Sequence, residues 1–125
     1  MVKRKELDAF FKKKSELLRD KETVKGLQQY ADNDVSGELK DAIRTLEDTI
    51  EQKERELAGE ERVIKDSIST VEDLTIRSIL LLRYVEAQPW KIIGAVFGLS
   101  DKMVTERVYN YFRKADNEVC QRDAD

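Results

Sequence analysis

The stretch QPWKIIGAVFGLSDKMVTERVYNYFRKA, residues 88–115, decides the fold of this chain. Pro89 suits the first turn of a helix because its missing N–H would have no partner there, and a helix is predicted to begin near Trp90. Gly98 can adopt the left-handed conformation that ends a helix, and the hydroxyl of Ser100 can cap the next helix. Two helices joined by this short turn form a helix-turn-helix.

Both helices of this motif have one apolar face. Ile93 and Phe97 lie one turn apart on the first helix, and Gly94 beside them would let a crossing helix come close. On the second helix, apolar side chains recur at spacings of three and four residues, at Val104, Val108, Tyr111, Phe112 and Ala115. The pattern predicts that these faces point into a core and that the other faces point into solvent.

A longer segment that contains this motif, LLLRYVEAQPWKIIGAVFGLSDKMVTERVYNYFRKA, resembles a known family. It is similar to the helix-turn-helix of sigma-factor region 4, and most closely to Gram-positive phage late-transcription regulators of the ArpU and RinA type. The matching positions are Leu80, Leu82, Arg83, Tyr84, Trp90, Ile93, Phe97, Gly98, Ser100 and Val104. Gly94 stands where the family usually has alanine, and Ile92 and Val96 stand where it usually has charged residues. The resemblance implies a small DNA-binding domain that acts in phage transcription.

Two helices with apolar stripes are predicted ahead of the motif. The first runs from Lys5 to about Tyr30, and the second covers residues 39–64, where apolar residues follow the heptad spacing of a coiled coil. These heptad residues are Leu39, Ile43, Leu46, Ile50, Leu57 and Ile64. The polar segment between the two helices, residues 31–37, predicts a bend. Periodicity leaves two partners open for the heptad seam: the first helix folded back as a hairpin, or a second copy of the chain.

A third helix is predicted between the heptad segment and the motif. Ser69 and Glu72 fit a capping box, so this helix would begin near Thr70 and run to about Glu86, where it would support the two motif helices. The chain is thus predicted to be all-α, with an N-terminal helical hairpin or coiled coil, a three-helix helix-turn-helix domain and a polar tail that frays. The boundaries of these three parts are residues 1–68, 69–116 and 117–125.

Several conspicuous residues are expected to have structural roles. Arg83 is expected to pair with an acid, and Tyr84 and Trp90 are expected to be aromatic residues of the core or its rim rather than DNA contacts. The run of lysines at residues 12–14 is expected to be a solvated helix face, because charged runs on helices usually are.

The composition excludes several classes of function. The 125 residues contain no His and one Cys, and there is no Gly-rich phosphate-binding loop. Carboxylates are spread along helix faces among Lys and Arg, so neither catalysis nor a metal or other cofactor is expected. The sequence has no apolar run of transmembrane length and no signal peptide, which predicts a cytoplasmic protein, in the host cell if it is phage-encoded.

The net charge of −3 is distributed unevenly along the sequence. Counting Lys and Arg against Asp and Glu gives +2 for residues 1–36, −5 for residues 37–82, +3 for residues 83–114 and −3 for residues 115–125. The motif is therefore the most basic segment. Nucleic-acid binding needs positive charge at the docking face rather than over the whole chain, so the acidic balance does not oppose it.

These observations favour a sequence-specific DNA-binding transcriptional regulator of phage type, whose helix from Ser100 enters the major groove of double-stranded DNA. The candidate base readers are Lys102, Thr105, Glu106, Arg107 and Asn110, and the candidate phosphate contacts are Lys91, Ser100, Arg113 and Lys114. The alternative is a helical adaptor that binds RNA polymerase or another phage protein, because Ile92 and Val96 are apolar on a face expected to be exposed. A homodimer would match paired half-sites in the DNA.

Overall fold

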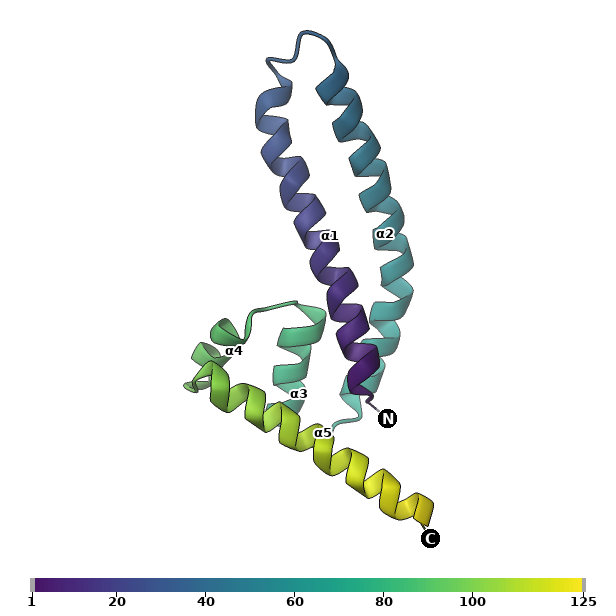
Figure 1. Cartoon of the computed structure of the whole chain (residues 1–125), viewed down its shortest axis with the longest axis vertical. Helices are drawn as coiled ribbons and strands as arrows, with labels where there is room; N and C mark the ends of the chain where they lie inside the picture. The colour runs from purple at the N-terminus through teal and green to yellow at the C-terminus, as the bar shows by residue number, and fades with distance from the viewer. Residues whose placement is uncertain (1, 125) are drawn as a thin grey trace.

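The computed structural model consists of helices joined by short turns, without strands, in the part of the chain that it describes, which is the backbone of residues 2–124 and the side chains of residues 2–116. The elements in chain order are α1 (Arg4–Ala31), α2 (Glu38–Ser69), α3 (Leu74–Leu80), the π-helical turn η1 (Leu81–Val85), α4 (Trp90–Phe97) and α5 (Asp101–Ala124). The first two helices form a long hairpin, and the other elements gather at its open end (Figure 1). The predicted all-α fold with an N-terminal helical pair is confirmed.

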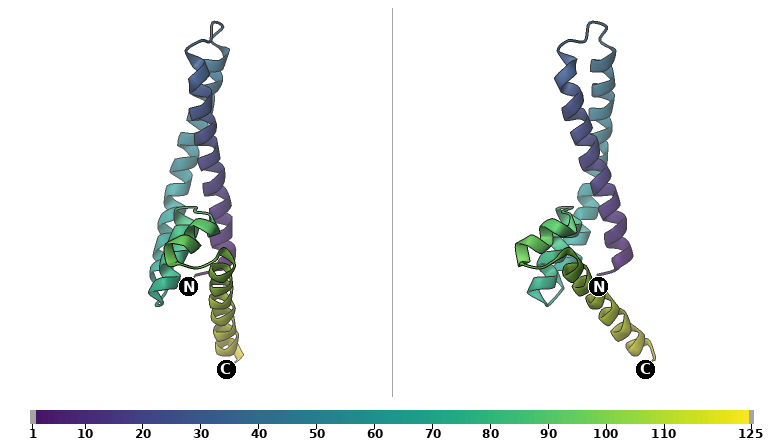
Figure 2. Two further views of the ribbon diagram at one scale, coloured as in Figure 1. Left: turned by 90° about the vertical axis from the view of Figure 1, so that its left-hand side faces the viewer. Right: turned by 60° about the vertical axis from the view of Figure 1, so that its left-hand side comes forward.

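The α1–α2 hairpin is held by an apolar seam along its length. The buried seam residues are Leu7, Phe10, Leu17 and Val24 from α1 and Ile43, Ile50, Leu57 and Ile64 from α2. The two helices run antiparallel and side by side (Figures 1 and 2). Their predicted stripes therefore face each other, and the heptad seam finds its partner within the same chain. A second copy is not needed to cover this seam.

Charged residues connect the two helices beside the seam. Lys13 Nζ lies 3.0 Å from Glu60 Oε1, and Lys53 Nζ lies 2.8 Å from Asp20 Oδ2. Two further pairs are Lys14–Glu61 and Lys21–Glu54. Lys53 and Glu60, which interrupt the heptad pattern, thus pair with residues of α1. Two lysines of the run at residues 12–14 pair with glutamates of α2. Exposed pairs of this kind contribute less than ~1 kcal/mol each, so they favour one register more than they add stability.

The turn that closes the hairpin is ordered by one carboxylate, and the predicted bend is confirmed here. Asp34 Oδ2 accepts hydrogen bonds from the amides of Leu39, at 2.9 Å, and Lys40, at 3.2 Å. Its Oδ1 accepts a third from the Ser36 hydroxyl at 3.0 Å. Burial alone would raise the pKa of Asp34, but these hydrogen bonds bring it below its ordinary value. Gly37 precedes α2 with φ +80°, which glycine adopts without strain.

The third helix begins later than the sequence predicts. α2 continues to Ser69 because Ile68 is fully buried and extends the apolar face of this helix. The Ser69 hydroxyl donates to a backbone carbonyl of α2 at 2.6 Å, so it does not cap a new helix. Asp73 caps α3 instead, where its Oδ1 accepts hydrogen bonds from two amides of the first turn at 2.9 and 3.1 Å. The predicted capping box at Ser69 and Glu72 is wrong.

The second motif helix is longer than predicted. The sequence pattern ends this helix near Ala115 and follows it with a frayed tail, but α5 continues to Ala124. Residues 116–124 contain neither glycine nor proline, so no residue there strongly disfavours a helix. The side chains of residues 117–125, including Cys120, lie outside the described part of the structure.

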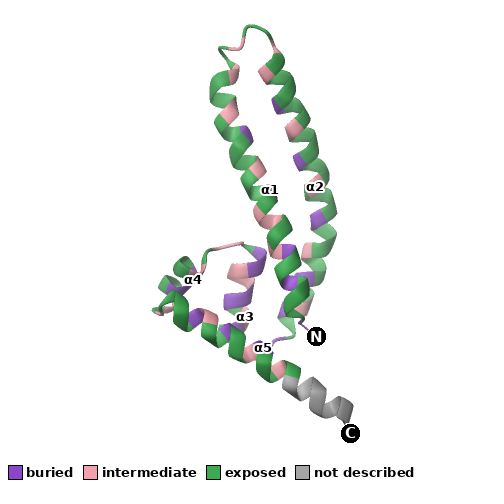
Figure 3. Ribbon diagram, in the orientation of Figure 1, coloured by how far each residue is buried: buried purple, intermediate pink, exposed green. Residues whose placement is uncertain are grey.

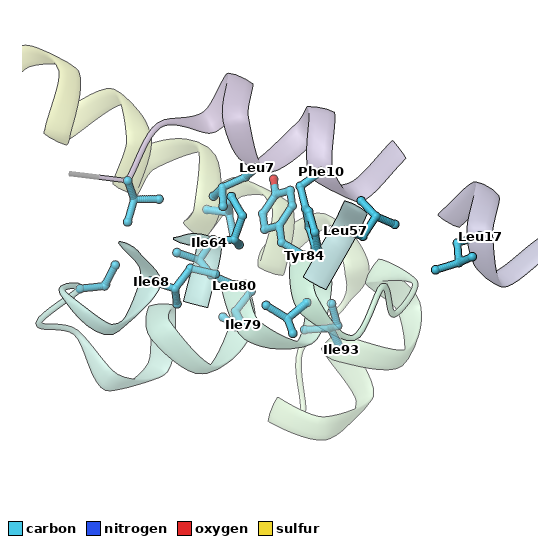
Figure 4. Close-up of a cluster of buried hydrophobic side chains, with 14 of the residues drawn as sticks. Leu7, Phe10, Leu17, Leu57, Ile64, Ile68, Ile79, Leu80, Tyr84 and Ile93 are labelled. Carbon is cyan, nitrogen blue, oxygen red and sulfur yellow. The ribbon is translucent and has the colours of Figure 1, made fainter. Parts of the chain in front are cut away.

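The open end of the hairpin shares one hydrophobic core with the shorter helices. Figure 4 shows Leu7, Phe10, Leu57, Ile64 and Ile68 of the hairpin clustered with Ile79, Leu80 and Tyr84. Buried side chains lie on the inner faces of the elements, whereas the outer faces of α4 and α5 are largely exposed (Figure 3). The boundary predicted at residue 68 thus falls at the end of α2, and a continuous core spans it.

Tyr84 lies inside this core, and its ionisation is expected to lower the stability of the fold at alkaline pH. Burial raises the pKa of Tyr84 to about 12, and Asp8 adds to the increase. Because the folded-state pKa exceeds the ordinary value of 10.0, the contribution of this group is complete below that pH and is lost as the pH rises toward 12. We expect the free energy of unfolding, measured by urea denaturation, to fall less steeply above pH 10.0 in Tyr84→Phe than in the wild type. The exposed Tyr109→Phe is the control; if both variants follow the wild type, Tyr84 does not titrate in this way.

Candidate nucleic-acid interface

The predicted helix-turn-helix is present, with its turn at the expected residues. Pro89 lies directly before α4 in an extended conformation, and α4 begins at Trp90. Gly98 ends α4 in the left-handed conformation, with φ +67°. The Ser100 hydroxyl accepts a hydrogen bond at 3.2 Å from an amide in the first turn of α5, which it therefore caps. The local signals in the sequence are sufficient to place both helices.

Gly94 allows α4 and the turn to come together. A Cβ atom at this position would lie 2.4 Å from the carbonyl oxygen of Leu99 and 3.2 Å from the carbonyl carbon of Ser100. The Leu99 amide also donates to the Gly94 carbonyl at 2.8 Å, so the turn folds directly over the glycine. The close approach is predicted by the sequence, but the predicted partner is wrong. Gly94 contacts the backbone of the turn and not a crossing helix.

Arg83 joins the hairpin to the motif. Its guanidinium carbon lies 3.9 Å from the ring centre of Phe11 in α1 and 4.5 Å from that of Trp90 in α4. Its Nη1 donates to the Gln88 carbonyl at 3.2 Å. Burial at this place lowers the pKa of Arg83. The expectation that Arg83 pairs with an acid is wrong, because two aromatic faces and a backbone carbonyl take the place of a carboxylate. The structural roles expected for Tyr84 and Trp90 are consistent with their buried and half-buried positions.

The backbone that leads from η1 to α4 is unusual. The Glu86 amide donates to the Leu81 carbonyl at 3.0 Å, which is the five-residue hydrogen bond of a π-turn. Ala87 follows with φ +55°, in the left-handed region that costs a residue with a side chain about 1–2 kcal/mol. The hydrogen bond from Arg83 to Gln88 spans this segment. A strained connection is thus held in place between the supporting elements and the motif.

α5 buries one face and exposes the opposite one. The buried residues are Val104, Val108 and Phe112, as predicted. Lys102, Glu106 and Arg113 are exposed, and steps of about 100° per residue place all three on the side away from that core. Three of the predicted DNA contacts therefore share the outer face of α5.

Three other predicted contacts lie on one flank of α5. Arg107, Asn110 and Lys114 are exposed and line a groove of about 900 Å³ between α5 and the α2–α3 turn. Glu72 and Asp73 form another part of the lining, so the groove has side chains of both charges. The sequence names Arg107 and Asn110 as base readers, but it does not reveal that the α2–α3 turn and the start of α3 form the other side of the groove.

Thr105 and Ser100 are less available than the other candidates. Thr105 is half-buried, and its hydroxyl donates to the Lys102 carbonyl at 2.9 Å. Although the sequence names Thr105 as a base reader, steps of about 100° per residue place it beside the buried Phe112, at the edge of the buried face. The Ser100 hydroxyl, predicted to contact a phosphate, is already engaged in capping α5.

The outer face of α4 is apolar and exposed. Ile92 and Val96 are 51% and 63% exposed, as predicted for this face. Lys91, a predicted phosphate contact, is exposed beside Ile92. Met103 in the first turn of α5 is also exposed, and sequence reasoning missed it. Steps of about 100° per residue place Met103 on the side of α5 away from the buried face formed by Val104, Val108 and Phe112, and this is the signal that could have identified it.

Comparison with models of protein families, with curated proteins and with solved structures finds no match for this chain. Within the described residues, no group of three or more His, Cys, Asp or Glu side chains is placed to hold a metal ion. In the same part of the chain, no helix is both long enough and apolar enough to cross a membrane. The support for the candidate interface therefore comes from the geometry of α4, the turn and α5.

That geometry suits insertion of one helix into a groove. The major groove of B-DNA is about 12 Å wide and admits one α-helix, and Lys102 and Glu106 on the outer face of the first turns of α5 are exposed. Lys102 and Arg113 provide positive charge on this face, and Glu106 between them can accept a hydrogen bond from cytosine N4. Lys91 adds a cation from α4.

Proposed function

We propose that this protein is a sequence-specific DNA-binding transcriptional regulator of phage type, which inserts the N-terminal half of α5 into the major groove. The observation that carries the proposal is the α4–turn–α5 unit, in which Gly98 ends one helix, Ser100 caps the next and α5 keeps a polar face outside. The net charge of +3 over residues 83–114 supports the same function.

The proposed roles follow from the positions of the side chains. Lys102 and Glu106 are assigned to base edges, because Lys donates to guanine O6 and N7 and Glu accepts from cytosine N4. Lys91 and Arg113 are assigned to phosphates, which position the protein without reading sequence. The three residues on the flank of α5 that line the groove are assigned to the edge of the interface, where they would meet the DNA backbone.

Substitution of two lysines separates base reading from phosphate contact. Lys102→Ala is expected to weaken binding to a duplex selected from a random library by ~1–3 kcal/mol and to relax sequence preference. Lys91→Ala is expected to weaken binding to all duplexes alike and to reduce the salt slope of log K by about one unit. Fluorescence anisotropy with the selected duplex and a scrambled duplex, over a series of salt concentrations, measures both effects.

Lys25→Ala is the matched control, because it removes the same charge from an exposed position on the hairpin. Its affinity for both duplexes should equal that of the wild type. Equal affinity of Lys102→Ala and the wild type for the selected duplex would remove Lys102 from the base readers. Binding that does not weaken with salt would contradict the phosphate contacts.

A second candidate function is a helical adaptor that binds RNA polymerase or another phage protein. The observation that favours it is the exposure of Ile92 and Val96 on α4, because neighbouring apolar residues in water often mark a protein contact. The salt series distinguishes the two functions. An adaptor would show no salt-dependent affinity for any duplex, whereas a DNA-binding regulator would show a steep dependence.

A further inference from the structure

The closed end of the hairpin, residues 30–41, exposes apolar and acidic side chains together. Tyr30, at the end of α1, is 67% exposed, and Val35 in the loop is fully exposed. The segment contains four carboxylates, at Asp32, Asp34, Glu38 and Asp41, against one lysine, so its net charge is −3. The hydrogen bonds that Asp34 accepts hold the loop in one conformation. The side chains of the closed end are therefore presented from an ordered frame.

The outer face of α4 has the complementary character. Ile92 and Val96 are exposed there, and Lys91 is the one charged residue in the sequence of α4. Lys102 and Met103 follow in the first turn of α5, and both are exposed. An apolar surface bordered by lysines thus lies within a segment of net charge +3. The closed end thus combines exposed apolar side chains with acidic ones, and the α4 face combines them with lysines.

We propose that the closed end of the hairpin docks on the outer face of α4 in a second copy of this chain. Docking would bury apolar side chains that otherwise remain in water, and it would bring the closed end, of net charge −3, against Lys91 and Lys102. The contact does not form within one chain, because the hairpin is nearly straight and α4 lies beside its open end (Figures 1 and 2).

Two chains lying antiparallel would make this contact twice. Each hairpin would reach α4 of the other chain, which gives a closed two-fold dimer that uses the same two surfaces reciprocally. The 28 residues of α1 span about 42 Å, and this length separates the two contacts. The α1–α2 seam stays intact in such a dimer, because both docking surfaces lie outside it.

The proposed contact would regulate DNA binding. It covers Lys91 and borders the first turn of α5, so a docked dimer and a DNA duplex would compete for the same face. This consequence rests on the proposed function, whereas self-association itself does not. The dimer would be the inactive form, and duplex DNA would shift the population to the monomer.

Sedimentation equilibrium without DNA tests the contact by itself. Over a concentration series, the wild type should pass from 14.5 kDa to twice that mass. The double variant Tyr30→Ser, Val35→Ser should raise the dimer dissociation constant at least about tenfold, and it should keep the fold because both side chains are exposed. Val63→Ser is the matched control, because Val63 is exposed on α2 outside both surfaces. It should dimerise like the wild type.

An exchange of charge tests the pairing of the two surfaces. Asp32→Lys and Lys91→Glu should each weaken self-association about tenfold when present alone. An equimolar mixture of the two variants should restore it. In the mixed dimer, the reversed closed end of one chain meets the reversed α4 face of the other, and the second contact is that of the wild type.

Three results would overturn the proposal: a wild type that stays at 14.5 kDa at the highest concentration reached, a double variant that dimerises like the wild type, or a mixture no better than its components. Addition of the selected duplex then tests the competition. Dimers that persist on bound duplex would overturn the competition alone. A protein that dimerises but binds no duplex would overturn the proposed function and leave the contact standing.

Discussion

Gly94→Val is expected to lower the free energy of unfolding by ~2–3 kcal/mol, because overpacking a well-packed site typically costs ~1–3 kcal/mol. The new Cβ would lie 2.4 Å from the Leu99 carbonyl oxygen, which belongs to the backbone and cannot rotate away. Either the turn or α4 must shift, and the hydrogen bond from the Leu99 amide to the Gly94 carbonyl would be strained. Gly94→Ala should cost less, because alanine gains ~1 kcal/mol over glycine in a helix.

Gly59→Val is the matched control for this substitution. No atom lies within 4 Å of a Cβ built at Gly59, so the same change in α2 should alter stability by less than ~0.5 kcal/mol. Urea denaturation followed by far-ultraviolet circular dichroism measures both variants. A Gly94→Val protein as stable as the wild type would show that the turn can open without cost, and the packing explanation for this glycine would be wrong.

Arg83→Ala is expected to lower the free energy of unfolding by ~2–3 kcal/mol. Cation–π contacts contribute ~0.5–1 kcal/mol each when exposed and more when desolvated, and Arg83 makes two of them. Its removal also takes the donor from the part-buried Gln88 carbonyl, which accepts at 3.2 Å, and a hydrogen bond contributes ~0.5–1.5 kcal/mol net. Arg83→Lys should recover only part of this, because an ammonium group cannot stack its plane on aromatic rings.

The control for Arg83 is Arg44→Ala, an exposed arginine on α2 that should change stability by less than ~0.5 kcal/mol. The urea series used for the glycine variants serves again. If Arg83→Ala and Arg44→Ala lose the same small amount, the contacts of Arg83 with Phe11 and Trp90 do not stabilise the fold.

Much of the fold follows from periodicity and local chemistry. The stripes on the first two helices, the polar bend and the Gly98–Ser100 turn are each encoded within a few residues, so the hairpin and the helix-turn-helix are predictable. The start of α3 is not, because Ser69 and Asp73 are both acceptable caps. The choice depends on the burial of Ile68, which keeps α2 helical past the first of them. Local capping rules do not predict the burial of Ile68, because it depends on residues that are distant in the sequence.

The candidate site was predictable to the level of helix faces. Steps of about 100° per residue correctly separate the buried Val104 and Val108 from the exposed Lys102 and Glu106. The partners across the chain were not predictable. Arg83 contacts Phe11, which lies near the other end of the sequence, and no spacing rule connects two such positions.

The contact of Arg83 with Trp90 also makes the intrinsic fluorescence of the protein sensitive to this region. Trp90 is the one tryptophan in the sequence, and it lies where the hairpin meets the motif. Its emission depends on how much water and which charges surround the indole ring. A change in the packing of Arg83 between Phe11 and Trp90 would therefore shift the fluorescence spectrum of the unlabelled protein. The same signal can be followed in a stopped-flow instrument, which gives the rate at which the surroundings of Trp90 change when the protein unfolds.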